Sequence, residues 1–338
     1  MHIWRRIQGF PKATSSRAYK TLKWILSATR PLNSDEIITA LAIKPLDSKF
    51  QAQQKVSLKH LLSACGDLVY EDNKGHLRFV HASVQEFLMQ QPELKDAEGF
   101  VADICFTALA FPQQPPIAIW DYAARNWVRH ARCWQEINDD RSTLIERFLL
   151  TARLEEWAEY LSKLLVLSSF DRATPPPPPL PASRYGAIGV CASFNVPIIL
   201  DHLLQRNTGH SEEDFSELVS AGLLLAAAGG HTDAARLLIN AGANTRWRML
   251  YRRSTLELNW RTGYGVGARV PETSFRPESR YSATALQMAA GSGHTEVVKL
   301  LLNNDADVND RGCFFVPRDQ WGGDTVRSIP GISAWTQR

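Results

Sequence analysis

The chain has 338 residues, of which 44% are hydrophobic and 22% charged, a balance typical of two or three ordinary globular domains. Its formal net charge is only +3, which excludes a chain that is basic throughout. No apolar run reaches the roughly 18 residues of a membrane helix or resembles a signal peptide. The five scattered cysteines form no C-x-x-C pair. We therefore expect a soluble protein of the cytoplasm or the nucleus, with reduced thiols.

Residues 18–91 contain three helical patterns followed by a hairpin. Apolar spacing predicts helices around Leu22–Leu26, after the N-terminal signal of Asn33–Glu36, and over Leu58–Cys65. The runs LVY and HLRFV flank the turn EDNKG and predict two strands. Three helices and a hairpin are the order of a winged helix, so we predict a winged-helix domain here. We expect residues 1–17 to be an N-terminal tail.

The stretch RFVHASVQEFL, residues 78–88, places His81 between a strand and a helix. Ser83 and Glu86 have the spacing of a capping box, which predicts a helix that begins at Ser83. The buried positions expected around His81 are Phe79 and Val80 in the strand and Val84, Phe87 and Leu88 in the helix.

Residues 92–172 are helical by period, and we predict a helical connector. Two stripes of apolar residues at helical spacing are interpreted as core. They are Trp120, Ala123, Ala124, Trp127, Val128 and Ala131, and Leu154, Trp157, Ala158, Leu161, Leu164 and Leu165. The run TPPPPPLP then predicts a stiff proline-rich linker over 173–183. Its R-x-x-P-x-x-P spacing also fits an SH3 ligand, a pattern that chance often produces.

Residues 184–310 contain an internal repeat. Aligning His231 with His294 superposes LLLAAAGGHTDAARLLINAGAN on LQMAAGSGHTEVVKLLLNNDADVN, and VCASFNVPIILDHLLQRN is a weaker upstream copy. The pattern resembles the ankyrin repeat, a helix-turn-helix unit of about 33 residues, and implies a solenoid of about three repeats. Each histidine heads a turn between helices, which favours a structural role over metal binding.

His231 and His294 are 63 residues apart, so residues 246–281 form an insertion. Its first part carries six arginines against one glutamate, together with tryptophan and tyrosine. Such a set can act as a protein hot spot or bind nucleic acid, and the simplest interpretation is a disordered loop. The candidate partner-binding residues are Arg248, Arg252, Arg253, Trp260 and Tyr264. We expect residues 311–338 to be an aborted repeat with a disordered C-terminus.

Motifs of catalysis and of cofactor binding are absent from the sequence. No P-loop, G-x-S-x-G elbow or H-E-x-x-H pair occurs. Gly263, Gly265 and Ala268 formally satisfy G-x-G-x-x-A, but Pro271 interrupts any following helix. We therefore expect no catalytic residue, no metal, no cofactor and no small-molecule substrate.

Nucleic-acid binding by the winged helix is also disfavoured. The third helix offers only Lys55, Lys59 and His60, and the turn between the strands is acidic. A surface that binds the DNA backbone needs more positive charge than this.

The ordered set of motifs resembles a known arrangement. Residues 18–90 resemble the winged helix that follows the NACHT NTPase domain in fungal NLR-like proteins, with ATRPLNSDEIITALAI, CGDLV and RFVHASVQEFL as matching blocks. This winged helix is sometimes named after GPI inositol-deacylases, but no nucleophile motif accompanies it here. DYAARNWVRHA resembles the next helical segment, after which ankyrin repeats commonly follow.

The resemblance implies that this chain lacks the NACHT domain. We expect a fragment, a degenerate paralogue or a mis-started gene model. His81 matches a histidine that can contact the nucleotide phosphate in such proteins, and we interpret it as vestigial here.

These features predict a non-enzymatic intracellular scaffold that binds a protein partner through ankyrin repeats. Two alternatives remain open. The first is a transcriptional co-regulator with ankyrin repeats, and the second is a sensor or regulatory fragment of a NACHT ATPase in non-self recognition.

Overall fold

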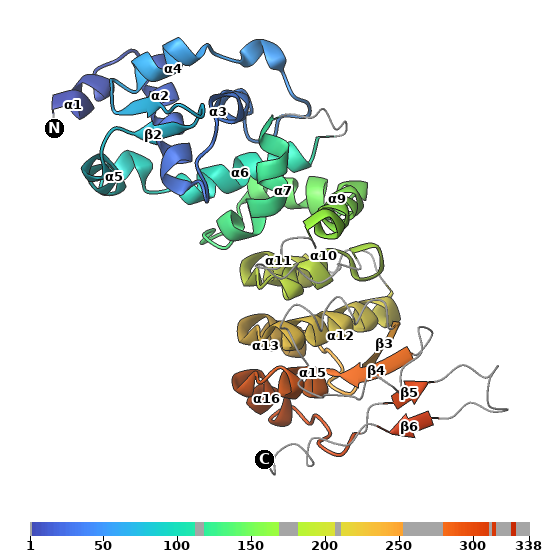
Figure 1. The fold of residues 1–338 in the computed structure, drawn as a ribbon. Helices are drawn as coiled ribbons and strands as arrows, with labels where there is room; N and C mark the ends of the chain where they lie inside the picture. The colour runs from blue at the N-terminus through green and yellow to red at the C-terminus, as the bar shows by residue number, and fades with distance from the viewer. Residues whose placement is uncertain are drawn as a thin grey trace. The chain divides into compact units, whose positions relative to one another are not determined.

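The computed structural model describes residues 2–111, 118–168, 182–206, 211–252, 280–310, 313–315 and 326–328. The protein is mainly α-helical, as the sequence predicts (Figure 1). It divides into two compact units, Met1–Arg153 and Leu154–Arg338, and each unit has its own buried core.

The first unit begins with helices and a hairpin in the predicted order. The elements are α1 His2–Gln8, α2 Lys12–Ser27, α3 Ser34–Leu41, η1 Ala52–Gln54, α4 Leu58–Ala64, β1 Val69–Glu71, β2 Leu77–Phe79, α5 Ala82–Met89 and η2 Pro92–Leu94. Strands β1 and β2 are antiparallel, with Val69 opposite Phe79. The backbone N–H of Leu77 also donates to the carbonyl of Leu32 at 3.0 Å, and an isolated bridge joins Asn33 to His76 just before α3. The predicted winged-helix order is confirmed.

Local signals explain where α3 begins and α4 ends. Asn33 Oδ1 accepts from the backbone N–H of Glu36 at 2.8 Å, and the Glu36 carboxylate accepts from the N–H of Asn33 at 2.9 Å. These two bonds close a capping box at the position where the sequence predicts a helix start. Beyond α4, Gly66 has a φ of +60°, a left-handed conformation that terminates the helix.

The expectation of an N-terminal tail over residues 1–17 is wrong. These residues form α1 and the start of α2, and Trp4 and Ile7 are 5% and 0% exposed. The Trp4 ring lies against Tyr19 and Phe87, with ring centroids 5.5 and 6.4 Å apart. The burial of α1 depends on partners elsewhere in the chain, so its sequence alone did not reveal it.

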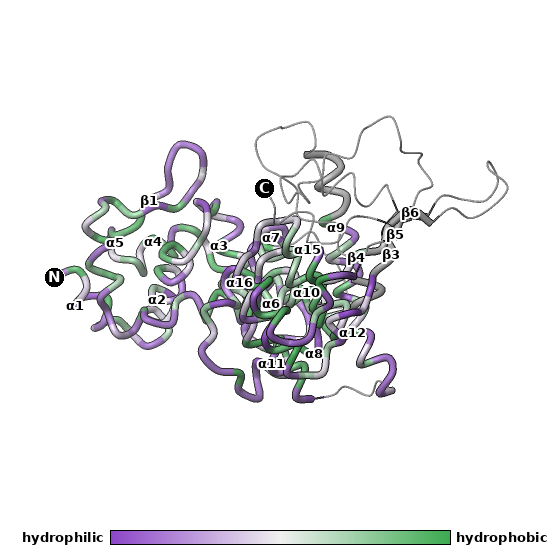
Figure 2. The backbone as a smooth tube through the Cα atoms, turned by 90° about the horizontal axis from the view of Figure 1, so that it is seen from below, coloured by the Kyte–Doolittle hydropathy of each residue, from purple (hydrophilic) through white to green (hydrophobic). Residues whose placement is uncertain are grey.

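Three further helices complete the first unit: α6 Ala97–Leu109, α7 Ala118–Ala131 and α8 Asp139–Leu149. Ten of the 13 residues of α6 are buried, and Figure 2 colours much of this helix as hydrophobic. Phe106 lies against Trp127, Trp134 and Phe148, with ring centroids 4.9 to 5.6 Å apart. The predicted apolar stripe on α7 is confirmed at Ala123, Ala124, Trp127 and Ala131, which are buried.

The predicted connector, residues 92–172, is divided between the two units. Residues up to Arg153 belong to the first unit, whereas most of α9 Ala152–Ser168 belongs to the second. There the Trp157 ring lies 6.1 Å from the ring of Phe194, at the end of the first repeat helix. Residues 173–181 of the predicted proline-rich linker, 173–183, lie outside the described residues, and the last two positions begin α10.

The described residues of the second unit form three helix pairs, which follow α9. They are α10 Ala182–Ser193 with α11 Pro197–Arg206, α12 Glu212–Gly229 with α13 Thr232–Asn240, and α15 Ala285–Gly291 with α16 Thr295–Leu302. Helices α10, α12 and α15 pack in sequence as a first row, and α11, α13 and α16 pack as a second row (Figure 1). The pairs therefore form a stacked array, as the internal repeat predicts.

Four strands extend this array in the order β3-β4-β5-β6. They are β3 Arg248–Arg252, β4 Arg280–Thr284, β5 Cys313–Phe315 and β6 Val326–Ser328, and all neighbours are antiparallel. The expectation of a disordered loop over 246–281 therefore needs correction at both ends of the insertion, because these ends pair as strands. Likewise, two parts of the C-terminal segment 311–338, expected to be disordered, add strands to the sheet.

Candidate partner-binding surface

The first row of helices and the strand pair β3–β4, here called the finger, form one side of the array. Strand β3 contacts α12, and β4 contacts α15 of the same row. The base of the finger is anchored, because Asn244 N donates to Ser220 Oγ at 2.9 Å and Trp247 packs against Ala221 and Leu224. The helices and the finger therefore present a single surface to a partner.

Two histidines hold successive repeats together. His231 Nε2 donates to the carbonyl of Ser193 at 3.0 Å, and His294 Nε2 donates to the carbonyl of Ala228 at 3.1 Å. Each bond runs from the start of one helix to the end of a helix in the preceding repeat. Because the bonds satisfy partly buried carbonyls at helix ends, they fix the spacing between repeats, and the predicted structural role of both histidines is confirmed.

Gly230 makes room for the second of these bonds. Its φ is +72°, and a Cβ at this position would lie 2.5 Å from His294 Nδ1. Gly242 has a similar φ of +90°, but nothing lies within 4 Å of the corresponding Cβ position. A substitution at Gly242 therefore measures the cost of the left-handed backbone alone, whereas one at Gly230 adds the cost of a steric collision.

We predict that Gly230→Ala destabilises the array more than Gly242→Ala does. Left-handed backbone alone costs an L-residue about 1–2 kcal/mol, so Gly242→Ala should lose that amount. Overpacking against a fixed ring should add about 1–3 kcal/mol in Gly230→Ala. Urea unfolding followed by circular dichroism measures both losses, and equal losses would contradict the proposed steric role of His294.

Of the five predicted partner-binding residues, the structure describes only Arg248 and Arg252. Arg248 begins β3, and its guanidinium forms an ion pair with Asp310. This pair neutralises the charge within the protein, which weakens the case for Arg248 as a partner contact. Arg252 ends β3 opposite Arg280. Arg253, Trp260 and Tyr264 lie outside the described residues, so their role stays a prediction.

A cation lies just before the base of the finger. Arg246 is exposed, and its backbone N–H donates to Asn244 Oδ1 at 2.9 Å. Arg236, on α13 of the second row, is also an exposed arginine. The two residues form a matched pair for testing which side of the array meets a partner.

His81 caps a helix, although not in the predicted way. Helix α5 begins at Ala82, and His81 Nδ1 accepts from the backbone N–H of Ser83 at 3.1 Å. The predicted capping box of Ser83 and Glu86 is therefore wrong, because the histidine ring already occupies the cap. Of the neighbouring positions expected in the core, Leu88 is buried and Val80 is 50% exposed.

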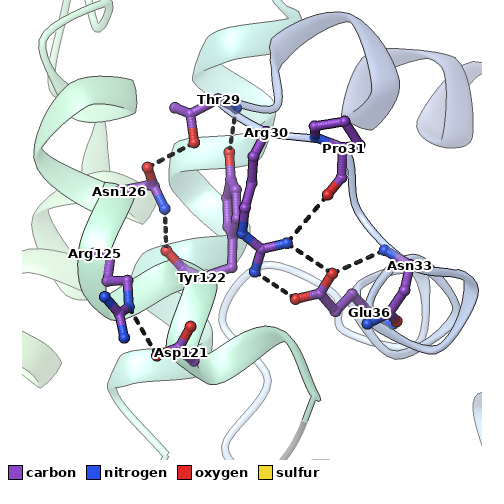
Figure 3. Close-up of polar contacts among 9 residues, drawn as sticks. All are labelled: Thr29, Arg30, Pro31, Asn33, Glu36, Asp121, Tyr122, Arg125 and Asn126. Atoms are coloured by element: carbon purple, nitrogen blue, oxygen red, sulfur yellow. Dashed lines mark hydrogen bonds and ion pairs between the residues drawn. The ribbon is translucent and has the colours of Figure 1, made fainter. Parts of the chain in front are cut away.

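A polar cluster that the sequence analysis missed joins the segment between α2 and α3 to α7 (Figure 3). Tyr122 Oη accepts from the backbone N–H of Thr29 at 3.1 Å, and Asn126 pairs with Thr29 Oγ1 at 2.7 Å. The Arg30 guanidinium donates to both carboxylate oxygens of Glu36 at 2.6 and 3.0 Å and lies over the Tyr122 ring at 5.4 Å. The cluster fixes the entry to α3.

The cluster continues inward as a buried chain of hydrogen bonds. His130, which is fully buried, bonds through Nε2 to Tyr122 Oη at 2.8 Å and through Nδ1 to the Glu98 carboxylate. Burial is the main cause that raises the pKa of the Tyr122 hydroxyl well above its usual value. Tyr122 therefore stays neutral and serves as a hydrogen-bonding bridge rather than as a base.

We predict that Tyr122→Phe destabilises the first unit by about 1–3 kcal/mol, because the N–H of Thr29 and the ring of His130 lose their shared partner. Tyr70→Phe is the matched control, since Tyr70 is 43% exposed, and it should change stability by less than about 0.5 kcal/mol. Thermal and urea unfolding of both variants test this. A Tyr122→Phe protein as stable as the control would show that the bridge is dispensable.

A groove lies beside this cluster in the first unit. It has a volume of about 360 Å³ and is lined by the end of α2, the segment before α3, β2 and the start of α5. Arg30, Arg78 and His81 line it, together with aliphatic side chains. His81 therefore lies at a groove, but nothing here tests the prediction of a vestigial nucleotide contact.

Comparison with known proteins defines the class of each unit. Residues 188–312 match the model of ankyrin repeats in three copies, so the array is an ankyrin-repeat array. Residues 11–101 match the model of the winged helix domain of GPI inositol-deacylase. The chain thus combines a winged helix domain with ankyrin repeats. No curated protein and no solved structure matches the chain.

The described residues also bear on membrane insertion, metal binding and thiol reactivity. Among them, no helix has the length and apolar character needed to cross a membrane, and no group of three or more metal-binding side chains occurs. Cys65, Cys105 and Cys191 are buried, whereas Cys133 is exposed. Burial raises the pKa of the Cys65 thiol to about 12, so this group is a poor nucleophile at neutral pH.

Proposed function

We propose that the protein is a non-enzymatic interaction scaffold that binds a protein partner on the first row and the finger of its ankyrin array. The observation that carries this proposal is the stack of three helix pairs, which matches ankyrin repeats over residues 188–312. Repeats of this kind present an extended surface, because each unit contacts only its neighbours and leaves one side open.

Features of the surface support its use in binding. The histidine bonds to Ser193 and Ala228 hold the repeats at a fixed spacing, so the surface is ordered before a partner arrives. Arg246 is exposed just before the finger, and arginines are enriched among residues that dominate binding energy. The candidates Arg253, Trp260 and Tyr264 belong to the same insertion and extend this proposal beyond the described residues.

The test compares charge reversals on the two sides of the array. Partners captured by the full chain are measured against Arg246→Glu, just before the finger, and Arg236→Glu, on the second row. We expect Arg246→Glu to weaken binding about tenfold and Arg236→Glu to leave it unchanged. Deletion of residues 253–279 with a two-residue turn in their place tests the insertion itself. If the partners bind every one of these variants as tightly as the original protein, a contact on the first row and the finger is refuted.

We also propose that the protein belongs with NACHT-associated proteins of the NLR type, in which repeats sense a partner in non-self recognition. The order of winged helix, helices and ankyrin repeats supports this proposal. Sequencing of the transcript upstream of the Met1 codon tests it, since an in-frame P-loop is expected there. A stop codon without such a motif upstream would count against it.

A transcriptional role is the alternative, because a winged helix can bind DNA. The exposed basic side chains of its helix α4 are only Lys59 and His60, and the His60 ring is bonded to Ser57 Oγ at 2.7 Å. Titration with duplex DNA at low and high salt separates the two proposals, since specific DNA binding should weaken steeply as salt rises.

A further inference from the structure

The groove on the first unit differs in chemistry from the ankyrin surface. Its volume of about 360 Å³ is near the lower end of ligand clefts, which span about 300–1,000 Å³. The floor is aliphatic and aromatic, with Leu32 and Ile37 at 2% and 0% exposure and Ile25 and Phe79 beside them. A cleft of this size accommodates a few side chains of an extended segment rather than a folded domain.

The charges at the groove are arranged with the cations outward. The Arg30 side chain is 43% exposed while its partner Glu36 is 7% exposed, and Arg78 is 45% exposed while its partner Asp72 is 13% exposed. The buried carboxylates therefore orient the guanidinium groups from behind. None of the residues that line the groove, all of which belong to the described part of the chain, is acidic.

Hydrogen-bond donors at the rim remain available. Arg78 uses Nε for its bond to Asp72 Oδ2, at 2.6 Å, which leaves its terminal N–H groups outside that bond. His81 accepts from Ser83 through Nδ1, so the neutral ring carries its hydrogen on Nε2. The Gln85 side chain is exposed at the same rim. The groove therefore offers an apolar floor to apolar side chains and hydrogen-bond donors at its rim to acceptor groups of a ligand.

We propose that this groove binds a short acidic peptide segment in which aliphatic or aromatic side chains stand between carboxylates. The apolar side chains would occupy the floor, and the carboxylates would accept bonds from Arg78, His81 and Arg30. This docking site is separate from the ankyrin surface and does not depend on it.

A nucleic acid fits the same groove less well. Binding to a phosphate backbone requires several cations along a surface, whereas each arginine here already faces a carboxylate. The exposed Glu71 also lies close by, at the end of β1 and opposite Leu77. A short acidic peptide needs fewer cations than a phosphate backbone, and its apolar side chains gain contacts with the floor that a backbone of phosphates lacks.

The experiment selects binders from a random dodecapeptide display library on the immobilised full-length protein. Enriched peptides are synthesised and titrated against the full chain, with methyl signals of Ile25, Leu26 and Ile37 observed by NMR. We expect a class of enriched peptides with alternating acidic and apolar residues, which shifts these signals. Replacement of their carboxylates by amides should weaken binding about tenfold.

Three protein variants complete the test. Gln85→Glu adds a negative charge at the rim without removing a hydrogen bond, and it should weaken the peptides about tenfold. Arg78→Gln should do the same, and Lys74→Gln, an exposed residue outside the groove lining, should have no effect. The proposal is overturned if no enriched peptide is acidic, or if the acidic peptides bind Gln85→Glu as tightly as the original protein. It is also overturned if duplex DNA or ATP, but no peptide, shifts the three methyl signals.

Discussion

A protein cut after residue 101 should fail to fold, whereas one cut after residue 153 should fold cooperatively. The match to the winged helix domain ends at residue 101, yet this position lies inside α6, Ala97–Leu109. The longer version corresponds to the compact first unit. The winged helix of this protein should therefore be part of a larger folding unit.

The physical reason is that the helices after residue 101 complete the core of the winged helix. Helix α2 packs on α6, and α3 packs on α7. The shorter protein would also expose Trp24, whose ring lies 5.7 Å from that of Tyr122, and would leave the N–H of Thr29 without its acceptor. Burial of one large apolar side chain contributes about 1.5–3 kcal/mol, so exposure of the core faces of α2 and α3 removes a large part of the roughly 5–15 kcal/mol that stabilises a typical domain.

Far-UV circular dichroism and two-dimensional NMR of both proteins measure this outcome. The version ending at 153 should show dispersed amide signals and one cooperative urea transition. A dispersed spectrum from the version ending at 101 would contradict the account, because the winged helix would then fold without α7.

The second large effect is expected from Phe106→Ala. Phe106 is fully buried and touches three aromatic rings, those of Trp127, Trp134 and Phe148. Removal of a buried phenyl ring leaves a cavity, so the free energy of unfolding should fall by about 3–5 kcal/mol.

Phe50→Ala is a suitable control, because Phe50 is only partly buried in the segment before η1. It should cost about 1 kcal/mol or less. Phe106→Leu should lie between the two variants, since it fills part of the cavity. Urea unfolding curves rank the three proteins, and a Phe106→Ala loss equal to that of the control would mean that the aromatic cluster is not the core of this unit.

Periodicity predicted the parts of the fold that repeat or alternate. The buried stripe on α7 could be predicted because Ala123, Trp127 and Ala131 recur at helical spacing. The repeat array could be predicted because His231 and His294 mark equivalent turns. Asn33 and Glu36 lie three residues apart, so the helix start that they signal could be predicted locally. Each of these signals is contained within one element or one repeat.

Other features depend on residues that are far apart in the chain. Thr29 and Tyr122 are 93 positions apart, and Glu98 and His130 are 32 positions apart, so no local pattern predicts their bonds. Helix α1 is likewise held by contacts of Trp4 with other helices. At the candidate surface, the sequence indicated the arginine-rich insertion, but it did not predict that Arg248 pairs with Asp310.

Amide hydrogen exchange of the full chain, with and without a captured partner, tests the central claim most directly. Binding on the first row and finger predicts slower exchange in α12, α15 and the strand pair β3–β4, with little change in α13 and α16. Protection confined to residues 2–153, or protection of α13 and α16 alone, would contradict binding through this side of the ankyrin array.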